Sequence, residues 1–164
     1  MKRTKTKTLA MLSVIVATAM ILSFIEAKIP NLVPVPGVKL GLANVAVIFT
    51  MYKFDEGRAA CISLIRVGLS ALLFGSFASL IYSAAGAVLS LALMTLSRRV
   101  FKLHTVGVSI IGGVSHNAGQ IAAAALVMGT ASIIYYLPVL ILSGTVAGIA
   151  IGFISNELIK RIKL

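Results

Sequence analysis

Long uncharged runs of apolar residues dominate the chain, and short clusters of basic residues separate them. Uncharged residues fill 18 positions from Thr8 to Ile25 and 31 positions from Val67 to Ser97. A third run, over residues 103–156, is 54 residues long and is interrupted only by two histidines. About 20 apolar residues in a helix cross the ~30 Å hydrocarbon core of a bilayer, so each longer run holds about two crossings. The pattern predicts an all-α integral membrane protein.

Prolines, glycines and charges divide these runs into one domain, 1–164, with six transmembrane helices. Lys28-Ile29-Pro30 ends the first helix because proline opposes its continuation, and the proline-rich segment 31–39 reads as an irregular apolar loop. The second helix has about 13 residues, which is short for a span. The predicted helices cover residues 8–27, 40–52, 59–74, 77–96, 105–128 and 133–156.

The distribution of lysine and arginine predicts the orientation, because basic loops stay on the cytoplasmic side. With both termini in the cytoplasm, 12 of the 15 basic residues lie on that side. Lys28 and Lys39 lie on the outer side, and Arg66 lies within the membrane. A signal peptide cut after Ala17-Thr18-Ala19 would leave an odd number of helices, so a retained first helix is favoured.

The composition excludes several other classes of protein. Only 12% of the residues are charged and 59% are apolar, whereas soluble domains average about 25% charged residues. The net charge of +11 does not indicate nucleic acid binding, because the cations lie between apolar runs rather than on one face. The single cysteine, Cys61, cannot build a disulfide framework or a metal-thiolate cluster and is expected to be a packing residue. We expect no metal and no cofactor.

Arg66 is the most informative residue, because a charge in mid-bilayer costs from about 3 to more than 10 kcal/mol unless it finds partners. It should face a polar interior. There it either binds an anionic or carbonyl-bearing ligand, or pairs with helix-end carbonyls or with Glu26.

A second polar cluster lies in the helix over 105–128, where His116 and Gln120 are one turn apart and Asn117 is adjacent. Such side chains are costly against lipid, so this sector must face a cavity or other helices. A polar contact between helices would explain it alone. Together with Arg66 at similar depth, the cluster favours a ligand cavity.

The proline-rich loop is the third feature, with Glu26 on one side and Lys39 to Asn44 on the other. A short helix entered through a Gly/Pro interruption is typical of transporter binding sites, where its N-terminal amides and dipole address an anionic group. The alternative is a re-entrant connector that only packs.

Small residues at four-residue spacing let helices approach closely in lipid. Gly144, Gly148 and Gly152 predict a packing face. Small residues of the first helix, Ser13 with Ala17 and Ala19 with Ser23, either dock another membrane subunit or pack internally.

Enzyme motifs are absent from the sequence, and we expect no catalytic activity. Ser115 and His116 are neighbours that point to different sides of a helix, so they form no nucleophile pair. No nucleotide-binding Gly-x-x-x-x-Gly-Lys-Ser/Thr loop occurs. The four acidic residues are scattered, whereas metal-dependent diphosphate chemistry needs several carboxylates around Mg²⁺.

The combined motifs resemble a known family. They are Pro34-Val35-Pro36-Gly37-Val38-Lys39-Leu40-Gly41-Leu42-Ala43-Asn44, Arg66, Tyr82-Ser83-Ala84-Ala85-Gly86 and His116-Asn117-x-Gly119-Gln120. The chain is similar over nearly its whole length to heptaprenyl diphosphate synthase component I, also called the Gx transporter family. That family resembles the substrate-binding S-components of energy-coupling factor (ECF) vitamin transporters, six-helix proteins of the bacterial cytoplasmic membrane.

The resemblance implies a ligand pocket near the outer half of the membrane, formed by the loop after the first helix and by the last three helices. It also implies coupling, through small residues of the first helix, to a transmembrane subunit driven by two ATPases. The usual Ala-x-x-x-Ala pair is absent in strict form. The candidate substrate-binding residues are Glu26, Lys39, Asn44, Arg66, Ser83, His116, Asn117 and Gln120.

Three functional hypotheses follow. The leading one is uptake of a small organic ligand, such as a vitamin, a flavin-like or an isoprenoid-related molecule, captured from the outer face. The second is a non-catalytic membrane subunit beside a soluble prenyl synthase in isoprenoid or quinone biosynthesis. The third is a proton-coupled carrier that uses Glu26 and His116.

Overall fold

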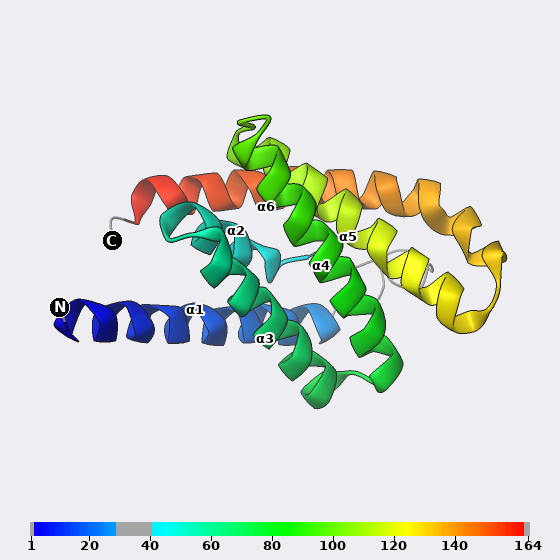
Figure 1. The fold of residues 1–164 in the computed structure, drawn as a ribbon, viewed down its shortest axis with the longest axis horizontal. Helices are drawn as coiled ribbons and strands as arrows, with labels where there is room; N and C mark the ends of the chain where they lie inside the picture. Colours follow the sequence, from blue (N-terminus) through cyan, green and yellow to red (C-terminus); the bar gives the residue numbers. More distant parts are fainter. Residues whose placement is uncertain (1, 29–40, 163–164) are drawn as a thin grey trace.

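The computed structural model describes residues 2–28 and 41–162, and these ranges form a bundle of helices without any strand (Figure 1). Five candidate membrane spans lie in the described residues: α1, α3, α4, α5, and α6 together with the 3₁₀-helix η1. The all-helical class predicted from the sequence is therefore confirmed, and five helices of the described residues, where the sequence predicted six, are long and apolar enough to cross a membrane. The elements are α1 (Lys2–Lys28), α2 (Asn44–Lys53), α3 (Glu56–Phe74), α4 (Phe77–Arg99), α5 (Thr105–Met128), η1 (Ala131–Tyr136) and α6 (Leu137–Arg161).

The two ends of the bundle differ in chemistry. The start of α1 and the end of α6 lie on the same side of the molecule (Figure 1). We call the end that carries the α2–α3 and α4–α5 connections the basic end, because Lys53, Arg58, Arg98 and Arg99 lie there. The opposite end, with the α3–α4 and α5–η1 connections, is called the turn end.

Helix α2 is short and lies inside the bundle. Its ten residues rise about 15 Å, half of the ~30 Å hydrocarbon thickness. Every residue from Val45 to Met51 is buried, as expected for a helix that is apolar on all sides. It packs on α1, α3 and α6, and Ile48 and Met51 are completely buried in the main hydrophobic core.

The predicted start of the second helix at residue 40 is wrong by four residues. The backbone of Gly41 has φ +71°, a left-handed conformation that glycine adopts readily. A turn follows, in which the Asn44 N–H donates to the Gly41 carbonyl over 2.8 Å. The helix can begin only after this turn.

Other boundaries also differ from the prediction. Helix α6 begins at Leu137 rather than near residue 133, because η1 precedes it and Pro138 lies in its first turn. Helix α3 begins at Glu56, where Asp55 caps it by accepting the Arg58 N–H over 2.8 Å. Helices α1, α4 and α6 continue past their apolar runs into the neighbouring basic residues. The predicted bounds followed the apolar runs and therefore made these helices too short.

Glycines bring α5 and α6 into backbone contact, which confirms the predicted packing face. A Cβ added to Gly148 would lie 2.6 Å from the Ile110 Cα, and one on Gly144 would lie 2.9 Å from the Gly113 carbonyl oxygen. The small residues of α1 divide differently: Ala19 and Ser23 are buried, whereas Ser13 and Ala17 are exposed.

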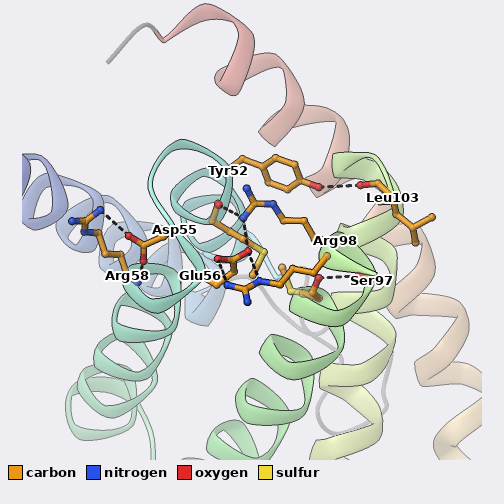
Figure 2. Close-up of polar contacts among 10 residues, drawn as sticks. Tyr52, Asp55, Glu56, Arg58, Ser97, Arg98 and Leu103 are labelled. Atoms are coloured by element: carbon orange, nitrogen blue, oxygen red, sulfur yellow. Dashed lines mark hydrogen bonds and ion pairs between the residues drawn. The ribbon is translucent and has the colours of Figure 1, made fainter. Parts of the chain in front are cut away.

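An arginine clamp at the basic end joins α2, α3 and α4 (Figure 2). The Arg98 guanidinium donates to the Met51 carbonyl over 2.6 Å and to the Glu56 carboxylate over 2.9 Å. It also lies over the Tyr52 ring, 4.7 Å from the centroid. Arg99 reaches the same carboxylate over 3.1 Å. The clamp therefore holds the C-terminal end of α2 against α3 and α4.

Replacing Arg98 with alanine is expected to lower the free energy of unfolding by about 1.5 kcal/mol, because Glu56 and the Met51 carbonyl both lose a charged donor. The Arg98 side chain is only 28% exposed. Arg99→Ala is the matched control: that side chain is 67% exposed, and an exposed ion pair contributes less than about 1 kcal/mol. Denaturant unfolding in detergent compares the two variants, and equal losses would contradict the clamp.

Candidate functional site

A small polar cavity lies between the last turn of α1, the start of α2 and the middle parts of α3, α5 and α6. Its volume is about 60 Å³. We call it the polar cavity. Six of the eight candidate residues line it, although they come from four different helices and span 95 positions from Glu26 to Gln120. The six are Glu26, Asn44, Arg66, His116, Asn117 and Gln120.

A second hollow of about 90 Å³ adjoins the polar cavity and shares Glu26 and Arg66 with it. We call it the serine-lined hollow. Ser83, the seventh candidate, lies here. The eighth candidate, Lys39, and the proline-rich loop lie outside the described residues. Arg66 therefore stands between two hollows rather than against a single one. The serines that name the hollow are Ser23, Ser70, Ser79 and Ser83.

Glu26, in the last turn of α1, is engaged by its surroundings. Its carboxylate accepts the Gly41 N–H and acts electrostatically on Arg66. The N–H groups of Asn44, Val45 and Ala46 donate to the carbonyls of the preceding turn. These N-terminal amides of α2 are thus already used within the chain. The anionic group held at this segment is the Glu26 carboxylate.

The polar cluster of α5 combines two roles. The Asn117 Nδ2 donates to the Leu140 carbonyl over 2.7 Å, so Asn117 ties α5 to α6 and also lines the polar cavity. His116 and Gln120 lie against α4 at Gly86, where an added Cβ would be 2.7 Å from the His116 carbonyl oxygen and 2.9 Å from the Gln120 Cγ. The interhelical alternative therefore holds for Asn117, and the cavity position holds for all three.

In the described part of the chain, three buried polar atoms without hydrogen-bond partners border these two hollows, and a fourth, Ser155 Oγ, borders neither. Among the described residues four such atoms occur: Ser23 Oγ, Arg66 Nε, Ser109 Oγ and Ser155 Oγ. Ser23 borders the serine-lined hollow, Ser109 borders the polar cavity, and Arg66 borders both. Most buried polar groups in proteins are paired, so each exception requires an explanation.

Ser109 and Gly113 also line the polar cavity, although they were not predicted from the sequence. A signal for them exists in the sequence. Ser109, Gly113, His116 and Gln120 follow a spacing of three to four residues, which places them on one face of a helix. Extending the polar sector by helical periodicity would have found both residues. The α6 residues that complete the wall carry no polar atom in their side chains and give no such signal.

A larger cavity, which was not predicted from the sequence, lies between α4, α5, η1 and the start of α6. Its volume is about 350 Å³. We call it the apolar cavity. It shares Gln120 with the polar cavity, and Ser79 and Ser83 with the serine-lined hollow. Most of its remaining wall is apolar: Ile121, Ala124, Met128, Ile133 and Leu140.

Three of the four acidic residues have structural roles away from the cavities. Asp55 pairs with Arg58 at 2.7 Å, Glu56 belongs to the arginine clamp, and Glu157 pairs with Arg161 at 2.6 Å. Within the described ranges, no group of three His, Cys, Asp or Glu side chains could hold a metal ion. Glu26 is the acidic residue that lines the cavities.

A sequence model of the family described as heptaprenyl diphosphate synthase component I matches residues 15–158. The chain belongs to this family. The match runs from α1 to α6 and covers every cavity residue named above. A search of the curated proteins and a search of the solved structures each find no match.

Membership of the heptaprenyl diphosphate synthase component I family confirms the resemblance drawn from the sequence motifs. The family name describes one component of a synthase. The likeness to ECF S-components, which the motifs suggested through this family, remains a prediction, as do the roles of the candidate site residues.

Proposed function

We propose that this component I family member is a non-catalytic membrane subunit that binds a small organic molecule through an anionic or carbonyl group. Arg66, His116 and Gln120 hold that group, and Glu26, Asn44, Asn117 and Ser83 complete the surroundings. One observation carries the proposal: Arg66 Nε, Ser109 Oγ and Ser23 Oγ are buried without partners beside the two hollows. A bound polar group would supply what these atoms lack.

The proposed topology has six segments in the bacterial cytoplasmic membrane, with the basic end and both termini in the cytoplasm. Helix α2 crosses only the inner half of the bilayer. Two observations support this: the start of α1 and the end of α6 lie on one side (Figure 1), and Leu72, Phe77 and Leu126 near the turn end are 79–84% exposed. Large exposed apolar side chains suit a lipid environment. The ligand then enters from the outer face.

For uptake, the chain would act as an ECF-type substrate-binding component and pass its ligand to a transmembrane subunit with two ATPases. Helix α1 is the proposed contact. Its small residues Ser13 and Ala17 are exposed, and small residues allow close approach of another helix in lipid.

A second candidate function is favoured by the family match itself. The family name describes a component of heptaprenyl diphosphate synthase, so the chain would be the membrane partner of a soluble prenyl synthase subunit. Affinity purification of the tagged protein from its native membrane separates the two: ATPases and a coupling subunit indicate uptake, whereas a prenyl synthase indicates the synthase partnership.

Ligand retention tests the binding function directly. We expect the protein, extracted with its native lipid in copolymer discs, to carry a small anionic or carbonyl-bearing molecule detectable by mass spectrometry. Arg66→Gln should reduce the bound amount at least about thirtyfold, since a buried charged hydrogen bond contributes 2 kcal/mol or more. Arg58→Gln is the matched control, because Arg58 belongs to the same helix but pairs with Asp55 at the basic end.

Two results would contradict the proposal. One is a wild-type protein that retains no such molecule and is not stabilised by any member of a panel of small anions. The other is equal retention by Arg66→Gln and Arg58→Gln, which would show that the charge at Arg66 does not hold the ligand.

A further inference from the structure

Two successive stretches of helix α5 line two different cavities, one polar and one apolar. Residues from Ser109 to Gln120 line the polar cavity, and residues from Gln120 to Met128 line the apolar cavity. Gln120 belongs to both. The change from polar to apolar surroundings therefore occurs at one turn of one helix, in the direction of the turn end.

The backbones of α4 and α5 approach each other closely next to Gln120. At Gly119 an added Cβ would lie 2.9 Å from the Ala85 carbonyl oxygen and 2.9 Å from the Gly86 Cα. The two backbones thus touch at this level. Toward the turn end, Tyr82 of α4 and Ala124 of α5 face a common space instead. This backbone contact is adjacent in sequence to Gln120, the residue that lines both cavities.

The volumes of the cavities suit different parts of one molecule. The apolar cavity, about 350 Å³, falls within the range of about 300–1,000 Å³ usual for small-molecule sites. The polar cavity and the serine-lined hollow, about 60 and 90 Å³, are large enough only for a head group, given that a water molecule takes about 30 Å³.

We propose, on the basis of the ligand-binding function above, that the ligand is an elongated molecule with an anionic head and an apolar body. The head lies at Arg66 and Gln120, and the body lies in the apolar cavity between α4, α5 and η1. An arginine guanidinium recognises phosphate and carboxylate heads through paired hydrogen bonds. Ile121, Ala124, Ile133 and Leu140 supply the apolar wall.

The direction of this site distinguishes the ligand from bilayer lipid. In the proposed topology the apolar cavity is nearer the outer surface. Arg66 lies eight residues before the end of α3, which places it about 12 Å deeper than that end of the helix. An outer-leaflet phospholipid has its head at the surface and its chains toward the midplane, the opposite order. The ligand therefore enters head first.

Alkyl phosphates of increasing chain length test the proposal in phosphatidylcholine nanodiscs, with empty discs to subtract partitioning. Ethyl, butyl and hexyl phosphate are compared by titration calorimetry. We expect the affinity of the wild-type protein to rise by up to about fourfold for each added methylene that the cavity buries. Ala124→Leu and Ile133→Phe, which fill the apolar cavity, should flatten this rise. Ala122→Leu, on the exposed face of the same helix, should leave it unchanged.

Arg66→Gln separates failure of this proposal from failure of the proposed function. We expect it to weaken all three phosphates by the same factor. If Arg66→Gln weakens ethyl phosphate but chain length has no effect, or both filling variants keep the full rise, the amphiphile proposal is overturned while the binding function stands. If none of the phosphates binds in an Arg66-dependent way, both fall. A disc phospholipid retained by the wild type and displaced by no alkyl phosphate would also overturn the proposal, because the occupant would then be bilayer lipid.

Discussion

Gly148→Ala is expected to lower the free energy of unfolding by about 3 kcal/mol. The new methyl group would lie 2.6 Å from the Ile110 Cα and 2.9 Å from the Ser109 carbonyl oxygen. Both are backbone atoms of α5. Backbone atoms cannot rotate away as a flexible side chain can, so α5 and α6 must separate. Overpacking of this kind costs about 1–3 kcal/mol, and a backbone clash belongs at the upper end of that range.

Gly68→Ala is the matched control for this prediction. Gly68 is also in the middle of a helix, but an added Cβ there meets nothing within 4 Å. Because alanine favours the helix over glycine by up to about 1 kcal/mol, the control should be neutral or slightly stabilising. Denaturant unfolding in detergent, followed by circular dichroism, measures both variants. Similar values for the two would show that α5 and α6 are not packed through Gly148.

Glu26→Gln is expected to raise the affinity for ethyl phosphate about thirtyfold. The Glu26 carboxylate lines both hollows beside Arg66, so an anionic head that binds Arg66 meets a like charge. Over several ångströms at an effective dielectric constant near 20, that repulsion is on the order of 2 kcal/mol. Glutamine retains an oxygen that can accept the Gly41 N–H, so the local backbone contact survives.

Two further variants make this prediction specific. Glu157→Gln removes a carboxylate that pairs with Arg161 on the exposed end of α6, and it should leave the affinity unchanged. In the double variant Glu26→Gln/Arg66→Gln the gain should vanish, because it depends on the freed guanidinium. A lower or unchanged affinity in Glu26→Gln would mean that the anion does not bind beside this carboxylate.

Much of the site could be predicted from local sequence because burial of polar groups in an apolar segment has a large cost. Arg66 stands in mid-helix, and His116, Asn117 and Gln120 stand within one turn of each other in an otherwise apolar run. Such residues must find a common polar space, and the structure brings all four to one cavity. The roles within that cavity were not predictable: Asn117 donates to Leu140, 23 positions away.

The apolar cavity and the position of Glu26 show the limit of sequence reasoning. An alanine such as Ala124 reads the same in a sequence whether it faces lipid, another helix or a cavity. Its environment depends on where α4 and η1 lie, and the glycine contacts of α5 bring α4 close to α5. Similarly, Glu26 meets Gly41 only because α1 and α2 pack together.

The sequence by itself determined that this is an all-helical protein of membrane type, with a short second helix, a packing face on α6 and a family that its motifs identify. Run length and charge determine the class and the short helix, because the cost of exposing backbone or charge to lipid applies to each segment separately. The spacing of the glycines predicts the packing face, and the motifs identify the family. Only the tertiary structure decided which residues share a cavity, that the Glu26 carboxylate lines the polar cavity together with Arg66, and that a polar and an apolar cavity share Gln120. These features depend on contacts between distant segments, which no local pattern records.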